Sequence, residues 1–191
     1  MGNHPWTPFS QLIGRRTYLI NNGLTNGVKT VNETIEHITK LEGYHCFACG
    51  TKNPIGLNLN FYRRGDYVCS DITLGKNYEG WENMAHGGIT STLLDEIMSW
   101  TVLYFKRAFI VTRSMTVKYL RPVPLYKLLT AKGKIMEGGN NRLCRAKGMI
   151  QENDKNILAR AEAKFAILSD NDLLLVPDRL KRDMLNLFQS F

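Results

Sequence analysis

The stretch HGGITSTLLDEIMSWTVLYF, residues 86–105, decides the fold. From Ile89 to about Phe105, apolar side chains fall on nearly every side of a 3.6-residue repeat. A helix that is apolar all round is a buried one. We therefore expect this helix at the centre of the domain, with Lys106 and Arg107 complementing the negative end of its dipole.

Segments typical of β-strands lie on both sides of this helix. Before it, residues 55–74 alternate between apolar and polar around a Gly65-Asp66 turn, which predicts a β-hairpin, and a long loop follows over 75–86. After it, strand-like segments cover residues 109–120, 128–137, 142–151 and 156–168. The last segment carries small alanines on its apolar face, which leaves room for the buried helix. The order predicts an α+β fold, in which an antiparallel sheet of about six strands curls around one long central helix.

Both ends of the chain are predicted to be helical extensions. Helical spacing of apolar residues indicates one helix from about Asn32 to Glu42 and an amphipathic one from about Asp178 to Phe188. We expect an N-terminal extension over 1–44, a main domain over 45–169 and a C-terminal helix over 170–191. The 191 residues, 43% hydrophobic and 22% charged, fit one globular domain with extensions, and no apolar run reaches the roughly 18 residues of a membrane span.

Asp95 is the first candidate for chemistry. A buried helix has little use for a carboxylate, because an unpaired buried charge is costly. Helical spacing places this carboxylate on a polar stripe, so we interpret it as an active-site residue. Glu96 points roughly 100° away, and we favour a structural role for it. The stripe consists of Gly88, Ser91, Thr92, Asp95 and Ser99.

Gly87 and Gly88 stand at the N-terminus of the same helix. Backbone N–H groups there have no intrahelical partners and lie at the positive end of the dipole, so they can stabilise an oxyanion formed in acyl transfer. Gly88 and Asp95 are seven residues apart, roughly 10 Å along the axis, so one small carbonyl cannot reach both. We therefore expect a symmetric homodimer in which Gly88 of one subunit meets Asp95 of the other.

The four cysteines suggest reduced thiols. Cys46-Phe-Ala-Cys49 has metal-ligand spacing beside His45, but no second close pair exists, since Cys69 and Cys144 are isolated in strand-like segments. We expect a tight turn ahead of Gly50, with no metal and no cofactor. Residues 1–10 lack a basic segment followed by an apolar one, so we expect no secretory signal. Together with reduced thiols, this predicts a cytoplasmic location.

The net charge of +8 is unevenly placed. Residues 106–169 hold fourteen basic and four acidic side chains, or +10, and the remainder of the chain sums to −2. Either this stretch is a solvated sheet face or it serves an anionic partner. Helix-turn-helix, zinc-finger and RNP-like patterns are missing and the basic residues are dispersed, which argues against nucleic acid.

The sequence resembles the PaaI-like group of hotdog-fold acyl-CoA thioesterases. The resemblance lies in residues 86–96, with an HGG motif and an acid nine residues after its histidine. It extends to Cys46-Phe-Ala-Cys49-Gly50, to Asn53-Pro54-Ile55-Gly56-Leu57, to Tyr78-Glu79-Gly80-Trp81 and to Tyr119-Leu120-Arg121-Pro122-Val123-Pro124. It covers about 44–169 and implies the hotdog fold.

The resemblance implies hydrolysis of a thioester, with coenzyme A or an acyl carrier protein as the thiol. Asp95 would act as general base or as nucleophile, Gly88 with Gly87 would bind the thioester oxygen, and His86 would shape the loop. Some relatives carry a Ser or Thr near the acid, ten residues before the proline that ends the third strand, which is Thr112 here. Gly80 stands where some relatives have Asn, and Asn83 is the substitute in this chain.

Coenzyme A carries phosphates, so a basic rim suits it, and we expect Arg121, Arg142, Arg145 and Lys147 to contribute. Dimers or dimers of dimers (homotetramers) are expected, without membrane or nucleic-acid partners. Two alternatives stay open: a non-catalytic acyl-CoA-binding hotdog module, which would lose the acid, and a hotdog dehydratase or hydratase, which would place its His and acid differently.

Overall fold

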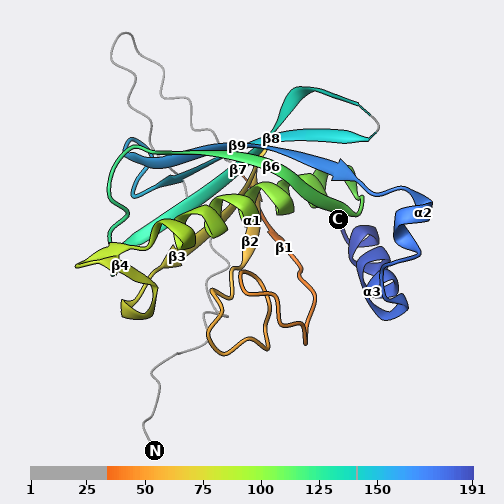
Figure 1. Cartoon of the computed structure of the whole chain (residues 1–191), viewed down its shortest axis with the longest axis horizontal. Helices are drawn as coiled ribbons and strands as arrows, with labels where there is room; N and C mark the ends of the chain where they lie inside the picture. The colour runs from red at the N-terminus through yellow and green to blue at the C-terminus, as the bar shows by residue number, and fades with distance from the viewer. Residues whose placement is uncertain (1–33, 141) are drawn as a thin grey trace, which may run out of the picture. The chain divides into compact units, whose positions relative to one another are not determined.

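The computed structural model describes residues 34–140 and 142–191, and Glu36–Phe191 form one compact unit. Its main feature is a seven-stranded sheet in the order β1-β2-β3-β7-β8-β9-β6, with helix α1 along one face (Figure 1). The sheet strands are β1 Ile35–Ile38, β2 Phe61–Arg64, β3 Tyr67–Thr73, β6 Ile110–Tyr119, β7 Leu128–Asn140, β8 Leu143–Gln151 and β9 Ile157–Ile167. The other elements are the 3₁₀ turn η1 Lys76–Tyr78, a small β4 Glu79–Trp81 and β5 Met84–Ala85 hairpin, α1 Gly87–Lys106, α2 Asp170–Leu173 and α3 Asp178–Gln189.

Each pair of neighbouring strands in the series β2-β3-β7-β8-β9-β6 is antiparallel. The predicted hairpin turn at Gly65-Asp66 is confirmed, because Arg64 pairs with Tyr67 and Gly65 takes the left-handed φ of 59°. The four strands predicted after the helix are also confirmed. Long alternating runs with turn residues between them leave few other ways to hydrogen-bond the backbone.

Helix α1 lies close against the sheet, as its sequence predicts. Leu93, Leu94, Ile97 and Met98 are fully buried. Gly133 on β7 allows the close approach, since a Cβ there would lie 2.7 Å from the Ile97 carbonyl oxygen. A glycine in the middle of a strand normally destabilises the strand, but here it leaves space for the backbone of α1.

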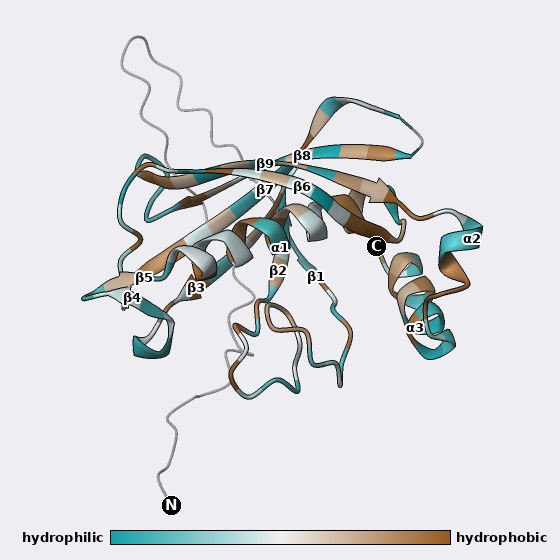
Figure 2. Cartoon of the chain, viewed as in Figure 1, coloured by the Kyte–Doolittle hydropathy of each residue, from teal (hydrophilic) through white to brown (hydrophobic). Residues whose placement is uncertain are grey.

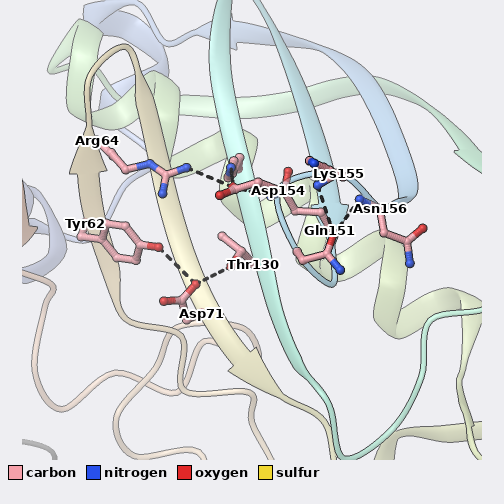
Figure 3. Close-up of polar contacts among 10 residues, drawn as sticks. Tyr62, Arg64, Asp71, Thr130, Gln151, Asp154, Lys155 and Asn156 are labelled. Atoms are coloured by element: carbon pink, nitrogen blue, oxygen red, sulfur yellow. Dashed lines mark hydrogen bonds and ion pairs between the residues drawn. The ribbon is translucent and has the colours of Figure 1, made fainter. Parts of the chain in front are cut away.

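The two faces of the sheet differ in chemistry. On β9, Ala159, Ala161, Ala163 and Phe165 are buried toward α1, so the predicted small-residue face is confirmed. The opposite face carries polar networks (Figure 3). In one, Asp154 accepts from Lys132 at 2.9 Å and from Gln151 at 3.1 Å, and pairs with Arg64 at 3.5 Å. In another, Asp71 accepts from Tyr62 at 3.1 Å and from Thr130 at 2.7 Å.

The prediction for the N-terminal extension is wrong where the structure describes it. Residues 34–42 contain strand β1 in place of a helix, and residues 32 and 33 lie outside the described part. Ile35 and Ile38 suit one face of a helix, but in the strand Ile38 is buried while Ile35 is exposed. The open edge of β2 supplies hydrogen-bond partners, and β-branched residues pack well on such an edge. The sheet therefore has seven strands where about six were expected.

Two further boundaries differ from the prediction. Strand β2 begins at Phe61, although residues 55–60 share its alternation, because Leu57 and Leu59 bond to a neighbouring loop: their N–H groups donate to Phe47 and Ala48. The expected loop over 75–86 contains η1, β4 and β5. The expected limits 1–44, 45–169 and 170–191 stay a prediction.

The C-terminal helix is confirmed as α3. It is amphipathic, with Leu187 and Phe188 buried (Figure 2). Tyr44, 139 positions earlier in the chain, contacts this helix by donating a 2.6 Å hydrogen bond to Asp183. Among the described residues, no helix combines the length and the apolar character needed to cross a membrane.

Candidate active site

The first turn of α1 is capped by a histidine. His86 Nδ1 accepts a 2.9 Å hydrogen bond from the Gly88 N–H, and the His86 N–H donates to the Tyr78 carbonyl at 2.8 Å. Gly80 lies so close that a Cβ there would be 2.8 Å from His86 Cα. A side chain at position 80 would therefore displace His86, which gives a physical reason for the glycine.

The two glycine N–H groups are not equivalent. The Gly88 N–H is engaged by the imidazole, whereas the Gly87 N–H has no acceptor within the described part of the chain. Both glycines are exposed. In this conformation Gly87 presents the free donor at the positive end of the helix dipole.

A pocket of about 360 Å³ lies beside Gly87. Tyr119, at the end of β6, lines it, and its hydroxyl lies 2.6 Å from Ser91 Oγ and donates to the Gly87 carbonyl at 3.2 Å. Trp81 and Arg121 line the same pocket, and Arg121 Nη1 donates to the Ile157 carbonyl at 2.7 Å. Sequence reasoning missed Tyr119 and Trp81 as site residues, although both stand within the quoted motifs.

Asp95 lies two turns further along α1, half-buried, and faces β6. Thr112 Oγ1 donates a 2.9 Å hydrogen bond to Asp95 Oδ1, so the structure brings together the two residues singled out from the sequence. A register shift between Thr112 and Ser114 makes this contact possible. With Arg113 as the extra residue, Thr112 shares the inward face with Met115 and Tyr119, against the simple period of two.

Within one chain Asp95 and the glycine turn do not meet. Both belong to the continuous helix α1, so the separation of roughly 10 Å along its axis stands. Asp95 does not line the pocket beside Gly87. One chain therefore presents two separate candidate half-sites, the glycine turn at the start of the polar stripe and Asp95 seven residues further along it.

Glu96 lies on a different side of α1. Its Oε1 accepts a 2.9 Å hydrogen bond from Trp100 Nε1. Burial raises the pKa of Glu96 to about 7, and the negative charge of Cys46 adds to the effect. This carboxylate bonds to neither Thr112 nor the glycine turn.

The remaining predicted binding residues are dispersed. Asn83 lies at the tip of the β4–β5 hairpin with φ 61°. Its backbone N–H donates to Glu79 Oε1, and its carbonyl accepts from the Leu125 N–H. Arg145 and Lys147 line a groove of about 610 Å³ on the sheet face away from α1, where Arg145 pairs with Glu162 at 3.5 Å. Arg142 lies in the β7–β8 turn. A single chain does not gather the four basic residues: Arg121 alone lines the pocket beside Gly87, because strand alternation sends the β8 pair to the other face. The expected basic rim stays a prediction.

An antiparallel sheet packed around a long helix, with a glycine turn at the helix N-terminus and an aspartate on its flank, defines a hotdog domain. Residues 82–155 match the family model described as the thioesterase superfamily. No curated protein matches.

Solved structures agree with this class. A thioesterase superfamily protein is 26% identical, with 64% of this chain and 60% of that chain covered and a TM-score of 0.59. A hypothetical thioesterase from Streptococcus pneumoniae TIGR4 with coenzyme A is 23% identical (55% and 82% covered, TM-score 0.50). The PaaI protein of the E. coli phenylacetic acid degradation operon is 16% identical (59% and 81% covered, TM-score 0.53). The chain spans less than two thirds of the first of these proteins. Together with the family model, these structures confirm the resemblance to PaaI-like hotdog thioesterases.

Proposed function

We propose that this protein is an acyl-CoA thioesterase that hydrolyses a thioester to a free acid and coenzyme A. The observation that carries the proposal is the 2.9 Å hydrogen bond from Thr112 to Asp95 on a helix that is otherwise largely apolar. A hydroxyl donor holds one carboxylate oxygen in place, which leaves the other oxygen for chemistry. Crystal structures of the S. pneumoniae thioesterase include variants with a threonine or an aspartate replaced by alanine, which are the same two residue types.

The active site is proposed to form between two copies of the chain. Among the strands that the structure describes, β6 is an edge strand, paired with β9 alone. Its residues Val111 and Tyr119 are about half exposed, at 50% and 55%. A ten-residue open edge is a ready template for a second copy. An antiparallel β6–β6 pairing would bring Asp95 of one subunit toward the glycine turn of the other, and completes both half-sites by symmetry. A dimer of such dimers is compatible with the same arrangement.

In this site the thioester oxygen would bind the free Gly87 N–H, with the Gly88 N–H joining once the His86 imidazole turns away. Asp95 either removes a proton from water, which then attacks the carbonyl carbon, or attacks that carbon itself to form an anhydride that water opens. In both cases the C–S bond breaks, the electron pair leaves with sulfur, and the oxyanion is stabilised by the helix N-terminus.

The substrate would enter beside Gly87. Arg121 offers the positive charge of this pocket to a phosphate of coenzyme A, and Trp81 and Tyr119 offer apolar surface to the acyl group or the pantetheine arm. A CoA complex of the S. pneumoniae thioesterase supports the choice of the thiol. Arg142, Arg145, Lys147 and Asn83 remain proposed contacts, to be reached from a neighbouring subunit.

A hydrolysis screen tests the proposal. The full chain is incubated with short, long and aromatic acyl-CoAs and with an acyl-carrier-protein thioester, and the released thiol is measured. We expect thiol and free acid from at least one acyl-CoA, and a dimer or larger species by light scattering. A protein that binds acyl-CoA without releasing thiol would support a non-catalytic module, and an active monomer would contradict the shared site.

A further inference from the structure

The side of α1 that carries Glu96 faces a turn with two cysteines. Cys46 Sγ, Cys49 Sγ and a carboxylate oxygen of Glu96 all lie within 4.8 Å of one another. Among residues 34–140 and 142–191, no other three His, Cys, Asp or Glu side chains come together in this way. The carboxylate stands 47 positions beyond Cys49 in the chain, so the tertiary structure supplies the ligand that a second cysteine pair would otherwise provide.

The 46–50 turn is a tight loop that holds two cysteine sulfur atoms close together. It is closed by the Gly50 N–H, which donates to the Cys46 carbonyl at 2.9 Å, and a Cβ at Gly50 would lie 2.5 Å from the Cys46 nitrogen. The Cys49 thiol and the backbone N–H groups of Cys49, Ala48 and Gly50 lie beside the Cys46 sulfur. Donors aimed at sulfur favour the thiolate, which is the form that binds metal ions.

The carboxylate is oriented and its charge is balanced. The Trp100 indole holds Glu96 Oε1 at 2.9 Å, as an outer-shell donor does in metal sites. Lys40 interacts with Cys46, Cys49 and Glu96, while its Nζ is fixed by Asn58 Oδ1 at 2.7 Å and the Leu59 carbonyl at 2.8 Å. Two thiolates and one carboxylate carry three negative charges, which a divalent cation and Lys40 together neutralise.

We propose that Cys46, Cys49 and Glu96 form a site for a thiophilic divalent cation of the Zn²⁺ type, with solvent as fourth ligand. Thiolates select zinc over magnesium and calcium, which prefer all-oxygen sites. A tetrahedral zinc with Zn–S bonds of about 2.3 Å holds its ligand atoms roughly 3.5–3.8 Å apart, so the three groups need to close by only about 1 Å. Cys46 is exposed, which gives the ion a path of entry.

Such an ion joins the 46–50 turn to α1 next to Asp95, and so has a structural role independent of the proposed hydrolysis. A disulfide between Cys46 and Cys49 is the competing chemistry, but a disulfide makes no use of a carboxylate. The two chemistries separate in the presence of a phosphine reductant, which keeps the thiols reduced.

The test is a Co²⁺ titration of the full chain, stripped with a chelator and kept reduced. We expect one Co²⁺ per chain, thiolate-to-cobalt charge-transfer absorption in the near ultraviolet, the visible bands of tetrahedral Co²⁺, and displacement by Zn²⁺. Reduced wild-type protein that shows neither set of bands overturns the proposal, whatever the variants do.

Variants assign the ligands. Cys49→Ser should abolish the charge-transfer band, and Glu96→Gln, which keeps an acceptor for Trp100, should weaken Co²⁺ binding at least about tenfold. Cys144→Ser is the matched control, because that buried thiol lies on β8 outside the cluster and should leave the spectrum unchanged. Circular dichroism verifies folding. Wild-type affinity in Glu96→Gln, or loss of the bands in Cys144→Ser, contradicts the assignment.

Discussion

Asp95 and Glu96 are neighbours in sequence with the same chemistry, yet they lie in two different environments. Asp95 is half-buried, faces the open edge strand β6 and accepts one hydrogen bond from Thr112. Glu96 lies under the 46–50 turn, accepts from Trp100 and stands among two sulfur atoms. A step of 100° on one helix thus separates a carboxylate that faces an edge strand from one enclosed by its own chain.

The difference shows that the neighbouring elements, and not the residue type, set what a carboxylate can do. An edge strand leaves space for the proposed substrate and the proposed second copy of the chain. A closed turn with two thiols leaves space for an ion at most. Four substitutions test this contrast.

Replacing Asp95 should have the largest effect. Asp95→Asn keeps the size and the contact with Thr112 but removes the base or nucleophile, so we expect kcat to fall at least about a hundredfold. The measurement is thiol release from the best acyl-CoA at saturation. Asp66→Asn, in the β2–β3 turn, is the control. Wild-type turnover in Asp95→Asn would remove the proposed catalytic role of this side of α1.

Replacing Thr112 should have a smaller effect on the same rate. Thr112→Val has the same shape but no donor, so Asp95 loses its fixed orientation and we expect kcat to fall roughly tenfold. Thr112→Ser restores the hydroxyl and should recover most of the rate. Equal rates in the Val and Ser variants would mean that the hydrogen bond does not position the carboxylate.

Arg121 tests the pocket beside Gly87. Arg121→Ala should raise KM for the acyl-CoA about fivefold, roughly 1 kcal/mol of binding, with kcat little changed. Lys155→Ala, on the exposed β8–β9 loop, removes an equal charge and serves as the control. A KM increase common to both variants would point to overall charge, and an unchanged KM in Arg121→Ala would place the phosphates elsewhere.

Trp100 tests the other carboxylate and should give the smallest change. Trp100→Phe removes the donor to Glu96 but keeps an aromatic ring against Phe61, whose centroid lies 4.3 Å away. We expect a loss of about 1 kcal/mol in the free energy of unfolding, from thermal or denaturant melts. Trp81→Phe, at an 81% exposed position, should leave that free energy unchanged. Equal stability of both variants would show that Glu96 does not need its partner.

Most of the fold follows from hydrophobic periodicity. Helix α1, the β2–β3 hairpin, strands β6 to β9 and α3 all carry long, regular patterns, and the structure confirms them. Strand β1 does not, because Ile35 and Ile38 fit a helix as well as a strand and the deciding factor is the free edge of β2, far along the chain. Short elements such as β4 and β5 depend on similar distant partners.

The candidate site was predictable only in part. Asp95 stands out because a carboxylate on an apolar helix demands a reason, and the family pattern marks Thr112. The network of Tyr119 with Ser91 was not predictable, because the bulge at Arg113 shifts which residues of β6 face inward. The dispersal of Arg142, Arg145 and Lys147 was missed because linear charge says nothing about which sheet face receives it.

The sequence by itself determined that a largely apolar helix, opened by His86-Gly87-Gly88 and carrying Asp95, packs against an antiparallel sheet. Local periodicity and helix geometry suffice for that. Only the tertiary structure decided that Thr112 reaches Asp95 and that Glu96 meets Cys46 and Cys49. Each of these contacts joins elements that are far apart in the chain. Packing, and not sequence spacing, therefore sets the distances between these side chains.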